Sequence, residues 1–309
     1  MNFNQNTEKV RNSKKAIITK LIGGLGNQMF QYATGLKLAK KNEADLLLDI
    51  SDFINYPGRE FALHNFNISG KIINESDNIS LIDQNTIFFK RIFLHINSLI
   101  NRKTSLPYIK EPYFHYYPNL LNSPCPCYID GYWQSEKYFF DIKKEIIEEF
   151  SLIKPINELS LKILNKIMEK NSVSIHIRRG DYITNTSANK FHGVCSLSYY
   201  YSAINLIKNH VENPFFIVFS DDIKWTKENL KISDEVIYVD HNGPEKSHED
   251  LFLMSRCSHH IIANSSFSWW AAWLSQNPRK MVITPTPWFD YQNYCYQDII
   301  PNDWIKIKK

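Results

Sequence analysis

Two adjacent arginines follow a short apolar stretch in the segment His176-Ile177-Arg178-Arg179-Gly180-Asp181-Tyr182. The planar guanidinium of arginine binds phosphate oxygens with two hydrogen bonds and stays charged at any working pH. Gly180 permits a turn behind the pair, and Asp181 can orient one guanidinium while the other faces a ligand. The segment therefore predicts an anion-binding site, and the alternative is a pair of surface arginines at the end of a strand.

A second group of polar side chains follows the apolar run 215–219. Ser220, Asp221 and Asp222 offer carboxylates, and a carboxylate can accept the paired N1–H and N2–H donors of guanine. Asp222 is the better candidate ligand, because Asp221 can instead cap the helix that is expected to begin at Ile223.

A third group, Asn264, Ser265 and Ser266, precedes a stretch with a helical pattern. Serine and asparagine are favoured helix caps, and the free N–H groups of a helix start also hold phosphate well. His176 lies two residues before Arg178, so both side chains face the same side of a strand. This histidine either flanks a base or ribose or is an ordinary core residue.

These three groups follow strands of one predicted sheet. Short apolar segments at 172–177, 215–219, 235–239, 260–263 and 281–284 alternate with helical patterns at 197–210, 223–231, 248–257 and 267–276. The alternation predicts a parallel sheet with helices on both faces, which binds ligands at the carboxyl ends of its strands. Three polar groups at that edge together predict a nucleotide site. We expect Trp269, Trp270 and Trp273 to pack the last helix onto this sheet.

The first half begins with a predicted βαβ unit: a strand at 16–22, a helix at 27–41 and a strand at 44–50. The turn Gly23-Gly24-Leu25-Gly26 lets the backbone approach a ligand closely, with the N–H groups of the helix start facing it. The apolar segment 87–100 predicts a buried helix in preference to a peripheral membrane contact, because its polar face is thin.

Composition excludes several classes of protein. The chain has 309 residues, of which 43% are hydrophobic and 22% charged, as in a soluble globular protein of one or two domains. A net charge of +4 is weak for a nucleic-acid binder. The five cysteines form no C-x-x-C pair, so neither a zinc site nor a disulfide scaffold is expected. A polar start and the lack of an apolar run of about 18 residues predict a cytosolic protein without a signal or membrane span.

Taken in order, these motifs resemble those of glycosyltransferase family 11, the α-1,2-fucosyltransferases. The resemblance spans about residues 16 to 289, and Ala271 departs from it where many members have glycine. The matching segments are 23–33, 131–139, 176–182, 219–222 and 253–270.

The resemblance implies an α/β fold of the GT-B type, with two Rossmann-like domains that face each other across a cleft. We expect an acceptor-side domain at 16–155 and a domain that binds GDP-L-fucose at 156–309. The implied reaction moves L-fucose with inversion, and without a metal or other cofactor, to the 2-hydroxyl of a terminal galactose. The expected acceptor is a bacterial O-antigen or capsule glycan, free or lipid-linked, at the cytoplasmic face of the inner membrane.

The resemblance also implies roles for individual residues. Arg178 is expected to bind the diphosphate as a catalytic residue, and Asn27 to lie near the reacting sugar. Asp181 and Glu136 are candidate general bases, although Asp181 can instead hold Arg179. The predicted donor-binding set is His176, Arg178, Arg179, Ser220, Asp222, Asn264, Ser265, Ser266 and Phe267, and the predicted loop beside the donor and acceptor is Gly24, Gly26, Asn27 and Gln28.

Two alternatives remain open. One is a transferase for another GDP-sugar or another acceptor linkage, and the other is a nucleotide- or glycan-binding module without activity. Nucleic acid is not an expected partner, because the basic residues are dispersed along the chain.

Overall fold

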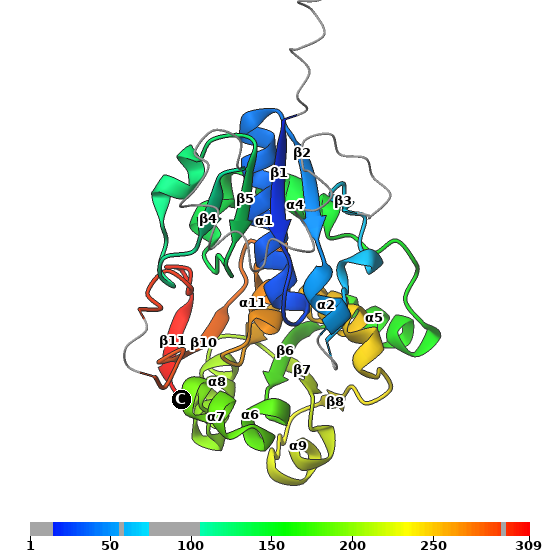
Figure 1. The fold of residues 1–309 in the computed structure, drawn as a ribbon. Coiled ribbons are helices and arrows are strands. Elements are labelled where there is room, and N and C mark those ends of the chain that lie inside the picture. The colour runs from blue at the N-terminus through cyan, green and yellow to red at the C-terminus, as the bar shows by residue number, and fades with distance from the viewer. Residues whose placement is uncertain (1–14, 56–58, 74–105, 292–294) are drawn as a thin grey trace, which may run out of the picture.

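The chain folds around two parallel β-sheets, which occupy the upper and lower halves of Figure 1. The computed structural model describes residues 15–55, 59–73, 106–291 and 295–309. The helix predicted at 87–100 lies outside these residues. The first sheet has the order β3-β2-β1-β5-β4, with all neighbours parallel. Its strands are β1 (Ala16–Lys20), β2 (Asp45–Asp49), β3 (Lys71–Ile72), β4 (Tyr108–Lys110) and β5 (Cys127–Asp130).

The predicted βαβ unit is confirmed, with α1 (Leu25–Asn42) connecting β1 to β2. Gly23 has φ of +78°, a conformation that side chains strongly disfavour, so this turn requires glycine. The first half also contains α2 (Ser51–Asn55) and α4 (Lys143–Glu149).

The second sheet has the order β11-β10-β9-β6-β7-β8 and confirms the predicted alternation of strands and helices. Its strands are β6 (Asn171–Ile177), β7 (Pro214–Ser220), β8 (Val236–Tyr238), β9 (His259–Ile261), β10 (Val282–Thr286) and β11 (Ile305–Lys308). Its helices are α5 (Glu158–Glu169), α6 (Gly180–Thr184), α7 (Thr186–His192), α8 (Leu197–Lys208), α9 (Ile223–Asn229), α10 (Ser247–Arg256) and α11 (Ser266–Leu274).

The register of this sheet gathers the predicted polar groups. Ile177 of β6 lies opposite Ser220 of β7, and Ile175 lies opposite Ile261 of β9. Because the three strands are parallel neighbours, the residues that follow them emerge at one edge. The predicted domain boundary at 155/156 falls between α4 and α5, and it stays a prediction.

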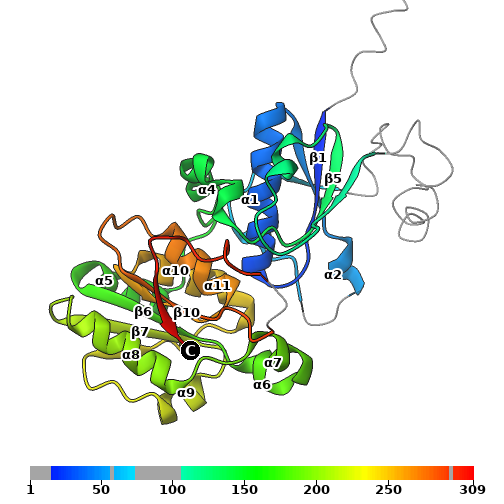
Figure 2. The same cartoon turned by 90° about the vertical axis from the view of Figure 1, so that its left-hand side faces the viewer.

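Helix α11 joins the two halves of the molecule. Trp269, Trp270 and Trp273 are buried as predicted, but their packing partners lie partly outside their own sheet. The ring of Trp270 lies 5.0 Å from Phe30 and 5.4 Å from Phe139, which both belong to the first half. Figure 2 shows α11 on the side of the second sheet that faces α1. This shared apolar core holds the two halves in a fixed relation, so a site can be built from both.

Among the described residues, no helix is both long and apolar enough to cross a membrane.

Candidate active site

The turns after β6 and β7 are locked together by ion pairs. Arg178 Nη1 lies 3.0 Å from Asp221 Oδ2, and the backbone N–H of Arg179 donates to Asp221 Oδ1 at 2.8 Å. Arg179 Nε lies 3.4 Å from Asp222 Oδ2. Both arginines therefore contact the neighbouring strand end. The side chain of Asp181 lies outside the described part of the structure, so its expected pairing with Arg179 stays a prediction.

Asp222, and not Asp221, caps α9. Its Oδ1 accepts from the backbone N–H of Trp225 at 3.2 Å, and its own N–H donates to Ser220 Oγ at 3.0 Å. The alternative that Asp221 caps this helix, left open by the sequence, is not observed, because its carboxylate contacts Arg178 and the N–H of Arg179. The guanidinium of Arg179 stacks on the ring of Trp225 at 3.4 Å. The side chains of Arg179 and Asp222 are therefore held in place by each other and by Trp225.

His176 shares its side of β6 with the start of α11. Its ring lies 5.4 Å from that of Phe267, and the side chain is only 4% exposed. Burial and the nearby charge of Arg178 lower the pKa of His176 to about 3, so the imidazole is neutral at working pH. Within the described residues its buried Nδ1 makes no hydrogen bond. Buried polar atoms are normally paired, so this nitrogen is a candidate ligand contact.

The start of α11 lies next to these side chains. Ser265 caps the helix, with its Oγ accepting from the N–H of Phe267 at 3.3 Å. Ser266 Oγ donates to Asn27 Oδ1 at 2.7 Å and thus links the helix start to the first half. The first turn of a helix presents N–H groups and a partial positive charge, which favour an anion.

Asn264 does not fit its predicted ligand role. Its buried side-chain Nδ2 donates to the backbone carbonyls of His192, Gly193 and Trp288 at 2.8, 3.2 and 3.1 Å. The N–H donors of the Asn264 amide are therefore already in hydrogen bonds. They connect the segment at 192–193 to the segment at Trp288.

The start of α1 is the part of the first half that contacts the start of α11. A Cβ on Gly26 would lie 2.4 Å from the backbone carbon of Ser266, so this glycine lets the starts of α1 and α11 touch. We call this contact, formed by Gly26, Asn27, Ser266 and Phe267, the junction. Of the predicted loop, Gly24 caps α1 and the residues after it are helical.

Gln28, by contrast, turns away from the junction. Its amide donates to the carbonyls of Gly23 and Glu60 and accepts from the N–H of Ala62, all within 2.9 Å. The buried side chain therefore braces the glycine turn from behind.

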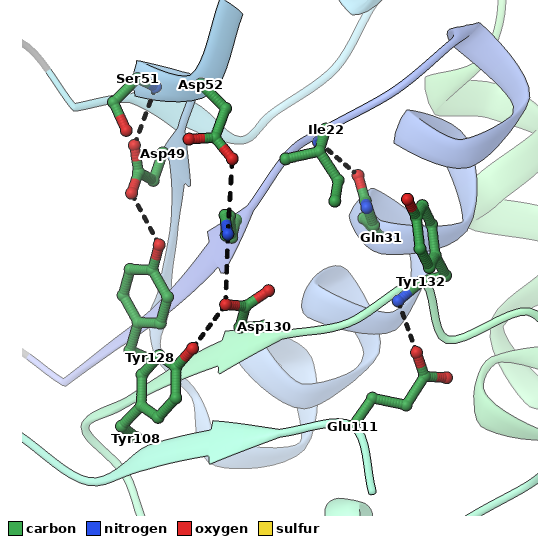
Figure 3. Close-up of polar contacts among 11 residues, drawn as sticks. Ile22, Gln31, Asp49, Ser51, Asp52, Tyr108, Glu111, Tyr128, Asp130 and Tyr132 are labelled. Atoms are coloured by element: carbon green, nitrogen blue, oxygen red, sulfur yellow. Dashed lines mark hydrogen bonds and ion pairs between the residues drawn. The ribbon is translucent and has the colours of Figure 1, made fainter. Parts of the chain in front are cut away.

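A polar network that the sequence did not predict lies at the carboxyl edge of the first sheet (Figure 3). Lys20 lies between Asp52 and Asp130, at 3.4 and 3.2 Å. Tyr108 donates to Asp130, and its ring stacks on that of Tyr128 with centroids 5.5 Å apart. Stacked aromatic rings beside carboxylates can bind a ligand rich in hydroxyl groups, such as a sugar.

The loops after β4 and β5 each contribute a further residue. Glu111 accepts from the backbone N–H of Tyr132 at 2.7 Å (Figure 3) and from that of Trp133 at 3.0 Å. Burial raises the pKa of Glu111 to about 7. Gln134 Nε2 donates to Asn27 Oδ1 at 2.8 Å. The motif 131–139 marked this loop in the sequence, but nothing in the motif indicated a partner for Gln134.

Glu136, a candidate general base, lies away from the junction. Its Oε2 accepts from the indole N–H of Trp273 at 2.9 Å. Trp273 stands seven residues beyond Ser266, so the carboxylate contacts α11 about 10 Å along the helix from its start. This contact does not favour Glu136 as the base, and its role stays a prediction.

Comparison with known proteins identifies the family. The model of glycosyl transferase family 11 matches residues 2–308. The chain belongs to this family. A relative from Escherichia coli, named alpha-1,2-colitosyltransferase, is 36% identical over 302 residues, which cover 95% of this chain and 99% of the relative. The O-antigen biosynthesis glycosyltransferase WbnK from Escherichia coli is 34% identical and covers 93% of this chain and 99% of WbnK.

The fold agrees with that of a solved plant fucosyltransferase. A mutant of Arabidopsis thaliana FUT1 in complex with GDP matches with a TM-score of 0.50 and 13% identity, covering 88% of this chain and 70% of that one. The predicted GT-B architecture of this family 11 glycosyltransferase is confirmed.

Proposed function

We propose that this family 11 glycosyltransferase moves L-fucose from GDP-L-fucose to the 2-hydroxyl of a terminal galactose. The observation that carries the proposal is the convergence, at one edge, of Arg178, the start of α11 and the unpartnered Nδ1 of buried His176. The adjacent guanidinium groups of Arg178 and Arg179, together with the N–H groups of the helix start, are suited to bind a diphosphate. The neutral imidazole of His176 is suited to contact the nucleoside or the sugar. A bovine relative named galactoside alpha-(1,2)-fucosyltransferase 2, 28% identical over 264 residues, adds support.

In the proposed mechanism, negative charge grows on the departing phosphate as the bond to the sugar breaks. Arg178, already oriented by Asp221, stabilises this charge together with the N–H groups at the starts of α1 and α11. These fixed donors supply the electrostatic stabilisation that a metal provides in other transferases, so we propose that the reaction needs no metal. Asp222 is our candidate for the guanine edge, and Ser265 and Ser266 for the phosphates.

The acceptor is proposed to bind along the first sheet. The network of Lys20, Asp130 and stacked Tyr108 presents carboxylate and aromatic groups at its carboxyl edge, next to the loop that leads to the junction. Asp181, in the first turn of α6 beside Arg178, remains our candidate for the base that takes the proton of the acceptor hydroxyl.

A second candidate function is α-1,2-colitosyl transfer, because the relative of that name is 36% identical over nearly the whole chain. Colitose is fucose without its 3-hydroxyl, so both sugar nucleotides present the same diphosphate and the same reacting carbon. The two activities differ only in the group that meets the 3-hydroxyl.

A panel of donors and acceptors tests the proposal. GDP-fucose, GDP-colitose and GDP-mannose are offered with lactose, lacto-N-biose, N-acetyllactosamine and Galβ1,3GalNAc, with and without EDTA, and products are identified by mass spectrometry. We expect a fucosylated product, linked to the 2-hydroxyl of galactose, that EDTA does not diminish. A strong preference for GDP-colitose would favour the second candidate, and the absence of product from every pair would favour a binding module.

We further propose that the acceptor is an O-antigen or capsule glycan, free or lipid-linked, used at the cytoplasmic face of the inner membrane. The name of the relative WbnK supports this setting. Cell fractionation followed by activity assays tests it, and an active enzyme found wholly outside the cell would contradict it.

A further inference from the structure

Asn27 stands where three chain segments meet. Its Oδ1 accepts hydrogen bonds from Gln134 Nε2 at 2.8 Å and from Ser266 Oγ at 2.7 Å. Asn27 belongs to the first turn of α1, Gln134 to the loop after β5, and Ser266 to the start of α11. A carbonyl oxygen has two lone pairs, and both are engaged here. The amide Nδ2 makes no hydrogen bond among the described residues, so it is left as a donor at the junction.

The loop that carries Gln134 is held on both sides. Before it, Glu111 accepts from the backbone N–H groups of Tyr132 and Trp133. After it, Ser135 Oγ accepts from the N–H of Lys137 at 3.3 Å and caps the turn that follows. Gln134 itself is only 7% exposed. Its backbone is thereby fixed and its side chain enclosed, so the hydrogen bond to Asn27 has a set direction.

We propose that Gln134 is a positioning residue that orients the amide of Asn27 so that Nδ2 donates to the sugar nucleotide at the junction. The inference rests on the proposed function, because the group that receives this donor is the sugar nucleotide held by Arg178 and the start of α11. The hydroxyl of Ser266 can donate or accept and therefore follows either orientation of Asn27. In the structure Gln134 presents Nε2 to Asn27, and because this group can only donate, it selects the orientation in which Oδ1 faces it. A fixed donor aimed at developing charge accelerates the reaction without reorganising.

A double-mutant cycle between Gln134 and Asn27 tests the proposal. Gln134→Met keeps the volume and removes the hydrogen bond, and we expect kcat to fall about tenfold, as for one lost hydrogen bond. The KM for the sugar nucleotide should change less than about twofold, since Arg178 and α11 still hold the phosphates. In an Asn27→Ala background, Gln134→Met should lower kcat further by less than about twofold, because the residue it positions is gone.

Ser135→Ala is the matched control, because it loosens the same loop without touching Asn27. Its effect on kcat should be equal in the wild-type and Asn27→Ala backgrounds. An equal loss from Gln134→Met in both backgrounds would show a merely structural role and overturn the proposal. If Gln134→Met does not fold, Gln134→Asn shortens the side chain by one methylene and serves in its place.

A second readout does not depend on turnover. In Gln134→Glu the side chain can only accept when ionised, so the amide of Asn27 should turn round to donate to it. The side-chain amide resonances of Asn27, assigned by their loss in Asn27→Ala, should therefore shift in an ¹⁵N NMR spectrum, while those of Asn264 stay in place. Unmoved Asn27 resonances would contradict the positioning role. If the wild-type enzyme used no GDP-sugar, the proposed function would fail, and this spectrum would still decide the role of Gln134.

Discussion

The two sheets bring different chemistry to the junction. The first sheet delivers glycines and amides, with Gly26 against α11 and Asn27 bonded to Ser266. The second sheet delivers a cation, hydroxyls and a neutral imidazole, in Arg178, Ser266 and His176. The first half therefore lets the backbones of α1 and α11 come close together, and the second half supplies the charged group. This division suits a reaction in which a charged group leaves one side and a neutral sugar is passed to the other.

Removal of the cation should give the largest effect. Arg178→Ala should lower kcat at least about a hundredfold, as the loss of one fixed donor to a developing charge typically does. Steady-state kinetics measures the loss, and circular dichroism should show an unchanged fold. Arg279→Ala removes an exposed arginine and should leave kcat unchanged. Near-normal turnover by the Arg178→Ala enzyme would contradict the claim that the second half supplies the charge for the reaction.

Close approach in the first half is tested by a pair of glycines in α1. Gly26→Ala places a Cβ 2.4 Å from Ser266, and Gly35→Ala places one 2.1 Å from Thr19 Oγ1 within the first half. Both should destabilise the fold by about 1–3 kcal/mol through overpacking, as measured by urea unfolding. Only Gly26→Ala should also lower the activity of the folded enzyme, by about tenfold if the junction opens by a fraction of an ångström. Equal specific activities of the two variants would contradict a role for the junction.

A third effect is a pH dependence of stability with opposite signs in the two halves. The pKa of His176 is lowered to about 3, so between about pH 6.5 and 3 this residue is protonated in the unfolded chain and neutral in the folded chain. The free energy of unfolding therefore falls as the pH drops from about 6.5 toward 3. The pKa of Glu111 is raised to about 7, so its contribution is present below about 4.5 and is lost as pH rises through 7. Urea unfolding from pH 4 to 8 measures both slopes.

His176→Gln should weaken the acid-side loss of stability, and Glu111→Gln should weaken the loss between pH 4.5 and 7. Each variant serves as the control for the other, because they act in different halves. Parallel curves for both variants and the wild type would show that neither group titrates as described.

The elements of the second half were predictable because their pattern is local. Most strands there are short apolar runs, and β6 and α11 lie within two residues of their predicted ends. The helices α5, α6 and α7 were not predicted. The glycine turn of the first half was predictable for the same reason. The strand β11 was missed because the segment Ile305–Lys308 alternates with lysine and lies at an edge, where little of it is buried.

Partners across the sequence were not predictable. Asp221 and Asp222 are distant from the arginines in the chain, yet they pair with them, because the parallel register sets Ile177 opposite Ser220. In the same way, the residues next to Asn264 in the sequence did not indicate that its amide donates to three carbonyls from two other segments.

The sequence by itself determined which chemical groups this enzyme carries and which strand ends they follow, because residue type and hydrophobic period are local properties. The tertiary structure alone decided which of those groups meet. Packing of Trp270 against Phe30 and Phe139 brings the start of α11 to the start of α1. Only then can Gln134 and Ser266 both donate to Asn27 Oδ1. Apolar burial is non-directional, so the contacts it creates between distant segments depend on the whole fold.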